Sequence, residues 1–206
     1  MRFSQTARVV AALIAVATWV GLIVQFDASL TLTHSPAGAL SAMLRYFRVI
    51  TNILVAIVFT LIAISTLRIS PSLMGCTVLA IMLVGIIYAL LLRGLIELSG
   101  GAKLADLLLH SVTPLLVPLF WLVFTPKGGL RWRDPLVWML MPLAYFIYAL
   151  LRAQIEGIYA YPFMNAAEIG WTRTMLNAVV LAAGFLIAGN ALVWLDRRMA
   201  KGNSYP

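Results

Sequence analysis

Six long runs of apolar residues, separated by short polar segments, constrain this chain more than any other feature of its sequence. A helix needs about 20 apolar residues to cross the roughly 30 Å hydrocarbon core of a bilayer. None of the runs shows the period-2 alternation of a membrane β-barrel strand. We therefore predict an all-α, polytopic membrane protein: one integral domain over residues 1–206, folded as a six-transmembrane-helix bundle. The predicted spans are residues 7–26, 46–67, 73–92, 107–124, 135–151 and 174–195.

Composition excludes the main alternatives. Hydrophobic residues make up 63% of the chain and charged residues 11%, whereas soluble domains are about 45–50% apolar and about 25% charged. A disordered chain would lack this much apolar surface. The net charge is +8, but the basic residues lie between the apolar runs and form no stripe that would follow a phosphate backbone. We therefore expect no nucleic-acid partner.

The distribution of Lys and Arg predicts the orientation in the membrane. Six spans place both termini on one side, and that side carries nine basic residues against six on the other. By the positive-inside rule, both termini are cytoplasmic in a multi-pass protein of the cell membrane. The nine are Arg2, Arg8, Arg68, Lys127, Arg131, Arg133, Arg197, Arg198 and Lys201, and the six are Arg45, Arg48, Arg93, Lys103, Arg152 and Arg173.

Polar residues gather near the start of the second span. Arg48, Thr51, Asn52 and Val55 are spaced i, i+3, i+4 and i+7, which places them on one face of a helix. Lipid offers no hydrogen-bond partner, so we expect this face to turn toward neighbouring helices. Two interpretations follow: Thr51 and Asn52 bond a neighbouring helix structurally, or they take part in function.

The fourth span begins with a second polar group. Asp106 lies one helical turn before His110, so its carboxylate can fix the tautomer of the imidazole. His110 is then either a histidine hydrogen-bonded at the membrane interface or a functional residue. The face that it begins continues through Thr113, Pro114, Val117, Pro118 and Trp121.

The segment before the last span combines charge with aromatic residues. Arg152 and Glu156 are spaced as a helical ion pair. The aromatic side chains are Tyr159, Tyr161, Phe163 and Trp171. They form either an interfacial belt or a lid over a pocket in the outer leaflet.

Three short segments, in this order, carry a family resemblance: residues 46–52 (YFRVITN), 110–114 (HSVTP) and 159–163 (YAYPF). With the six spans, the chain resembles the androgen-induced membrane proteins and their bacterial six-span relatives, the Pr-six-Pr family. Animal members are threonine hydrolases that cleave branched fatty-acid esters of hydroxy fatty acids with an intramembrane Thr and a His. The resemblance places the family His at His110. The family Thr lies in a Phe-x-Thr-like stretch, where this sequence has Arg48, so either Thr51 replaces it one turn later or the hydrolase chemistry is absent.

The resemblance and the polar faces together give a site hypothesis. A threonine hydroxyl becomes a nucleophile when a base takes its proton, and nearby donors can stabilise an oxyanion or hold a carboxylate. The predicted catalytic residues are Thr51 as nucleophile, His110 as base and Asp106 as its orienting carboxylate, and the predicted substrate-binding residues are Arg48, Asn52, Tyr161 and Arg152. The substrate would be a lipid ester that enters from the membrane.

The sequence predicts no metal site and no cofactor, since His34, His110 and Cys76 show no ligand spacing. Membrane lipids are the expected partners, and the oligomeric state is unknown from the sequence. Two other functions stay open. A non-enzymatic protein could bind or carry a lipid or anionic solute, and a structural subunit could pack through the small residues Gly184 and Gly189. Hydrogen-bond distance between Thr51 and His110, or a gap that one water bridges, would favour the enzyme, and a separation beyond about two side-chain lengths would favour a structural bundle.

Overall fold

The computed structural model describes residues 1, 3–64, 68–94 and 99–202, with the backbone alone at 201 and 202. Arg2 and Leu67, the predicted end of the second span, lie outside the described residues, and Lys201 is described without its side chain. Within this part of the chain the structure is helical and contains no strand. The predicted all-α class is confirmed.

Six helices in the described residues are long and apolar enough to cross a membrane, which confirms the predicted number of spans. Three of them are built from more than one helical segment. The six are α1 (Gln5–Thr33); α3 (Phe47–Ile64); α4 (Pro71–Ile87) with the π-helical turn η1 (Tyr88–Leu92); α5 (Gly100–Leu107) with the π-helical turn η2 (Leu108–Val112) and α6 (Thr113–Phe124); α7 (Asp134–Trp138) with α8 (Leu140–Glu156); and α10 (Trp171–Gly202).

Five of the six helices are longer than the apolar runs predicted, whereas α3 is described over Phe47–Ile64, within the predicted 46–67. Three short helices lie in segments that we expected to be loops. These are α2 (Pro36–Leu44), the 3₁₀ turn η3 (Pro162–Met164) and α9 (Ala166–Ile169). The start of α2 has a clear local cause. The Ser35 hydroxyl accepts a hydrogen bond from the Gly38 N–H, and Pro36 occupies the first helical position, where its missing N–H costs nothing.

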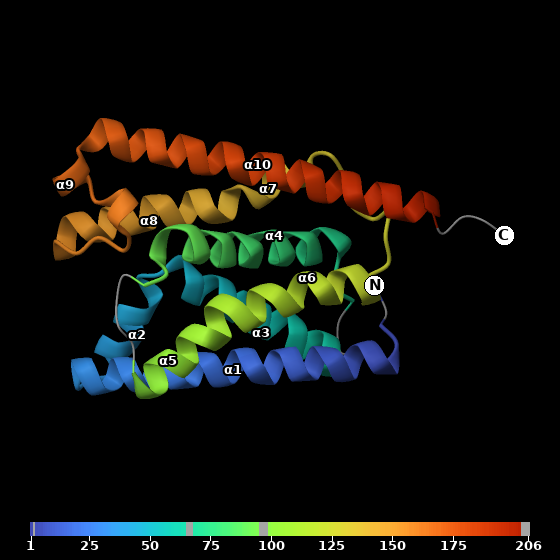
Figure 1. Ribbon diagram of the computed structural model, residues 1–206, viewed down its shortest axis with the longest axis horizontal. Coiled ribbons are helices and arrows are strands. Elements are labelled where there is room, and N and C mark those ends of the chain that lie inside the picture. The colour runs from blue at the N-terminus through green and yellow to red at the C-terminus, as the bar shows by residue number, and fades with distance from the viewer. Residues whose placement is uncertain (2, 65–67, 95–98, 203–206) are drawn as a thin grey trace.

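The bundle is layered around α4 (Figure 1). In that view α10, α7 and α8 lie on one side of α4, and α3, α6 and α1 lie on the other. The start of α1 and the end of α10 lie at the same end of the bundle. Met74, Val78 and Ile81 on α4 are fully buried, as expected for a helix enclosed by neighbours rather than by lipid.

Glycines allow the closest approaches between helices. An added Cβ at Gly75 on α4 would lie 2.7 Å from the ring of Trp138, and one at Gly189 on α10 would lie 2.9 Å from Pro135. Gly189 therefore packs inside this chain, so the idea that it contacts another subunit is wrong for this residue. Nothing in the described chain lies within 4 Å of an added Cβ at Gly184.

We predict that Gly75→Ala destabilises the protein by about 1–3 kcal/mol, because the new methyl group must displace the Trp138 ring. Thermal unfolding of the purified protein in detergent measures the change. Gly184→Ala is the matched control, since the same substitution on another membrane helix meets open space. Equal stability of the two variants would contradict the close packing of α4 against α7.

Candidate functional site

The site is built around the π-helical turn η2, which contains His110. At its end the Thr113 N–H donates to the Leu108 carbonyl instead of the Leu109 carbonyl, and Pro114 has no N–H to donate. The Leu109 carbonyl is therefore left without a donor from its own helix. Asn52 on α3 supplies one: its side-chain nitrogen donates to Leu109 O at 3.2 Å and to Arg48 O at 2.8 Å.

This contact gives Asn52 a structural role. Both hydrogens of its amide nitrogen are used by backbone carbonyls, its side chain is fully buried, and it does not line the cavity described below. The predicted substrate-binding role of Asn52 is therefore not supported by its position. The structural interpretation of Asn52, as a link between helices, fits its position. Without its donor the buried Leu109 carbonyl would cost about 1–3 kcal/mol of stability.

His110 is held on both ring nitrogens. Nδ1 lies 2.7 Å from Asp106 Oδ1, and Nε2 lies 3.3 Å from Arg48 Nη1. The Tyr88 hydroxyl donates to the other Asp106 oxygen at 2.5 Å. The Tyr88 ring stacks on the imidazole with a centroid distance of 4.1 Å and an interplanar angle of 5°. Arg48 also donates from Nη2 to Gln25 Oε1 at 3.2 Å. We call Gln25, Arg48, Tyr88, Asp106 and His110 the His110 cluster.

The partners of His110 fix its protonation pattern. A guanidinium group donates hydrogen bonds and accepts none, so Nε2 beside Arg48 must carry the lone pair. The proton then resides on Nδ1 and is donated to Asp106, which leaves the imidazole neutral. The sequence predicted that Asp106 orients His110, and the structure places the two side chains in hydrogen-bond contact.

A close helix contact brings Tyr88 to His110. An added Cβ at Gly85 on α4 would lie only 2.7 Å from Pro114 Cβ and 3.7 Å from the His110 carbonyl oxygen. Tyr88 follows Gly85 by three residues and His110 precedes Pro114 by four, so both aromatic rings lie about one turn from this contact. The absence of a side chain at Gly85 thus allows the two rings to stack.

The His110 cluster borders an apolar cavity of about 140 Å³. Its walls come mainly from α4, α8, α10 and the segment between the last two, and the polar residues Arg48, His110, Tyr145 and Tyr161 are among those that line it. The apolar walls are Leu83, Val84, Ile87, Leu143, Phe146, Phe163, Leu181 and Phe185, among others. Tyr161 lines the cavity, which fits its predicted place in the site.

Tyr161 belongs to a small group of aromatic residues at this end of the bundle. Its ring stacks on Phe163 at 5.1 Å and meets Tyr46 edge-on at 5.9 Å. Burial raises the pKa of the Tyr161 phenol above its ordinary value, and the nearby Arg48 charge opposes that rise. The hydroxyl therefore stays protonated at neutral pH and can donate a hydrogen bond to a ligand.

Thr51 lies apart from this arrangement. Its side chain is fully buried, it does not line the cavity, and within the described chain its hydroxyl has no hydrogen-bond partner. The direct Thr51–His110 hydrogen bond that would favour the enzyme is absent, because the available nitrogen of His110 faces Arg48 instead. The inward-turned face of α3 is nevertheless as predicted, since Thr51, Asn52 and Val55 are all fully buried.

Arg152 also lies outside the cavity. Its three side-chain nitrogens donate to Glu156 Oε1 at 2.7 Å, to Tyr148 OH at 2.8 Å and to Ser41 Oγ at 2.7 Å. The predicted Arg152–Glu156 pair is present. The predicted substrate-binding role of Arg152 does not fit this position, because its donors already link α8 to α2.

Sequence reasoning missed Gln25 and Tyr88. Each is a polar side chain within or at the end of an apolar run, and that signal is the same one that identified His110. Tyr88 has no polar neighbour at i±3 or i±4, and Gln25 has only Ser29, to which its side chain donates at 3.3 Å. The pattern therefore gave little reason to single out either residue.

Among the described residues, no three His, Cys, Asp or Glu side chains gather where they could hold a metal ion. In comparisons with known proteins, no family model, curated protein or solved structure matches this chain. The function is therefore inferred from the geometry of the His110 cluster and its cavity.

We predict that His110 is neutral at pH 7 with its proton on Nδ1. Nitrogen-15 NMR of histidine-labelled protein in detergent distinguishes the two tautomers and the charged form. Of the two histidines, His34 is removed with His34→Gln so that only His110 contributes. In Asp106→Asn, we expect a mixture of tautomers, because the amide can donate as well as accept. A protonated Nε2 in the unsubstituted protein would contradict the Arg48 contact.

Proposed function

We propose that this integral membrane protein binds an anionic single-chain lipid, with the carboxylate on Arg48 and the first part of the chain in the adjacent cavity. One observation carries the proposal. Arg48 is one of the residues that line an apolar cavity within a bundle of membrane helices, and within the described chain no carboxylate forms an ion pair with it.

Among the described residues, the positive charge of Arg48 is in direct contact with neutral groups only. Arg48 is half-buried, and a cation partly removed from water costs free energy unless an opposite charge or strong hydrogen bonds compensate it. The protein supplies the neutral groups His110 Nε2 and Gln25 Oε1, together with the face of the Tyr46 ring at 5.2 Å. Asp106 lies beyond the imidazole. A ligand carboxylate would neutralise the Arg48 charge by accepting two hydrogen bonds from the guanidinium group.

The cavity limits the ligand. An apolar cavity of about 150 Å³ holds a molecule the size of benzene, so about 140 Å³ accepts a short part of an acyl chain. The remainder of the chain must lie outside the cavity. The chain can reach the bilayer between α8 and α10, because the wall residue Leu143 on α8 and Val179 on α10 are both exposed.

We predict that Arg48→Gln weakens binding of a long-chain fatty acid at least about ten-fold, the loss expected for one charge-assisted hydrogen-bonded contact. Equilibrium binding of a radiolabelled fatty acid to the detergent-purified protein provides the measurement. The fatty alcohol of equal length should bind the unsubstituted protein more weakly than the acid does.

Arg152→Gln is the matched control, because it removes the same charge at the same end of the bundle from a residue outside the cavity. We expect its fatty-acid affinity to stay within about two-fold of the unsubstituted protein. Equal losses in the two variants, or equal affinities for acid and alcohol, would disprove a carboxylate site at Arg48.

A second candidate is the hydrolysis of a lipid ester, favoured by His110, which lines the cavity and is hydrogen-bonded to Asp106. An imidazole oriented by a carboxylate is a general base, and the resemblance to the androgen-induced membrane proteins implies a threonine nucleophile. We assign that role to Thr51. Arg48 would have to leave Nε2, for example to hold the oxyanion, before Thr51 could pass its proton to His110.

Under the hydrolase proposal, a fluorophosphonate probe labels the purified protein at Thr51. Labelling should disappear in Thr51→Ala and persist in Thr60→Ala. Thr60 is the matched control because its hydroxyl lies on the same helix and donates to the Ala56 carbonyl. Mass spectrometry of the labelled peptide identifies the residue. Labelling retained in Thr51→Ala would disprove the nucleophile, and an unlabelled protein that binds fatty acid would support the binding function alone.

For localisation we propose the cell membrane with both chain ends in the cytoplasm. The support is the excess of Lys and Arg on that side in the sequence, nine against six.

A further inference from the structure

A second hollow lies at the other end of α10, far from the His110 cluster. It is formed by the last turns of α10 and by the segment between α6 and α7, and its volume is about 720 Å³. Its lining residues are Gly128, Trp132, Trp194, Arg197, Arg198 and Ala200. Arg197 follows Phe185, a wall residue of the first cavity, by twelve positions, which is about 18 Å of helix.

Two Arg–Trp pairs form the hollow. The Arg197 guanidinium lies over the Trp132 ring at 5.8 Å, and the Arg198 guanidinium lies over the Trp194 ring at 5.2 Å. Trp132 and Trp194 are 51% and 50% exposed, and both arginines are exposed. Four large side chains thus remain available to a ligand.

The positive charge of the hollow is not neutralised within the described chain. Its two nearby acids face the backbone instead. Asp196 Oδ2 accepts from the Gly128 and Leu130 N–H groups at 2.9 and 3.0 Å, and Asp134 Oδ2 accepts from the Arg131 N–H at 2.9 Å. No ion pair joins a carboxylate to Arg197 or Arg198 among the described residues.

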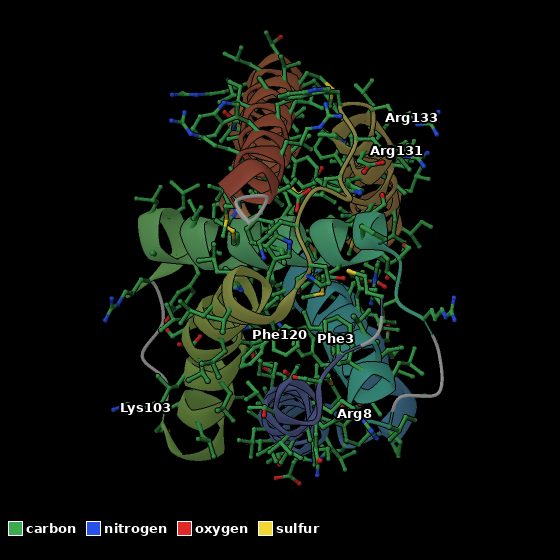
Figure 2. All side chains as sticks on the ribbon, turned by 90° about the vertical axis from the view of Figure 1, so that its right-hand side faces the viewer. Phe3, Arg8, Lys103, Phe120, Arg131 and Arg133 are labelled. Atoms are coloured by element: carbon green, nitrogen blue, oxygen red, sulfur yellow. The ribbon has the colours of Figure 1, made fainter. Side chains whose placement is uncertain are left out.

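Lys127, in the segment between α6 and α7, has a structural role. Lys127 Nζ donates to the carbonyls of Trp121 and Thr125, each at 2.6 Å, and so caps the end of α6. Burial lowers the pKa of the Lys127 ammonium. Figure 2 shows Arg131 and Arg133 beside α7 at the same end of the bundle, projecting away from α10, and neither lines the hollow.

We propose that this hollow binds the headgroup of an anionic phospholipid. A guanidinium group matches the phosphate oxygens as a two-donor fork. Half-exposed tryptophans are the side chains that prefer the boundary between hydrocarbon and water. The hollow lies where a membrane helix leaves the bundle, so the phospholipid is delivered by the surrounding bilayer at high local concentration.

The choice of a lipid over a soluble anion depends on this location. Basic pockets at the ends of membrane helices on the cytoplasmic side attract anionic headgroups, and the positive-inside rule predicts this end to be cytoplasmic. Nucleic acid would need a longer row of cations to follow its backbone, whereas here two guanidinium groups meet in one hollow.

The test measures lipid binding to the intact, detergent-purified protein by native mass spectrometry. Dioleoylphosphatidylglycerol and dioleoylphosphatidylcholine have identical chains and differ in headgroup charge. We expect preferential retention of phosphatidylglycerol, and a loss of affinity of roughly 25-fold in Arg197→Gln/Arg198→Gln, at roughly five-fold for each arginine near the surface. Fatty-acid binding at Arg48 should not change, which separates this site from the proposed function.

Arg131→Gln/Arg133→Gln is the matched control, because it removes the same charge at the same end. We expect its affinity to fall no more than about three-fold, since these arginines do not line the hollow. If the Arg197/Arg198 glutamine variant fails to fold, Arg197→Lys/Arg198→Lys keeps the charge, removes the fork and should still lose several-fold.

Four outcomes would overturn the proposal. They are equal losses in the two glutamine variants, equal binding of the two lipids, displacement of the lipid by millimolar inorganic phosphate, and tighter binding of a single-stranded oligonucleotide through the same two arginines. The first would indicate a diffuse field, the second a purely apolar contact, and the last two a soluble ligand.

Discussion

The Leu109 carbonyl needs a hydrogen-bond donor from outside its own helix, and the geometry of the site depends on how α3 provides it. The π-helical turn and Pro114 remove both possible donors from α6, and hydrocarbon cannot replace them. Asn52 supplies the donor at 3.2 Å. This bond fixes the height of α3 against η2, so that Arg48, one turn before Asn52, lies beside His110, one residue after Leu109.

Once this register is set, the His110 cluster links four parts of the fold. Gln25 comes from α1, Arg48 from α3, Tyr88 from the end of the third span, and Asp106 and His110 from the fourth. A positive guanidinium and a negative carboxylate lie on opposite edges of one neutral ring. Such a connected network is rigid when every member has a partner, and here only Arg48 also borders the cavity with a full charge.

Much of this architecture could be predicted from the sequence, since hydropathy gives the spans and the 3.6-residue period gives their buried faces. The Asp106–His110 contact also followed, because both residues belong to one helix. The partner of Nε2 did not, because the relative height of two helices is a tertiary property. A π-helical turn also rotates the residues that follow it. Spacing alone therefore could not tell whether Thr51 or Arg48 lies beside His110. Helix α2 was missed although Ser35 and Pro36 carry its start signal.

The length of α10 has a consequence for the kind of bilayer that suits the protein. Its 32 residues extend about 48 Å, and in Figure 1 its last turns continue past the neighbouring helices. A hydrocarbon layer of about 30 Å covers only part of that length, so α10 must tilt or stand out into the headgroup zone. Membrane thickness thereby sets the depth at which the Trp194 ring meets the lipid surface, and compartments with thin and thick bilayers would hold this chain differently.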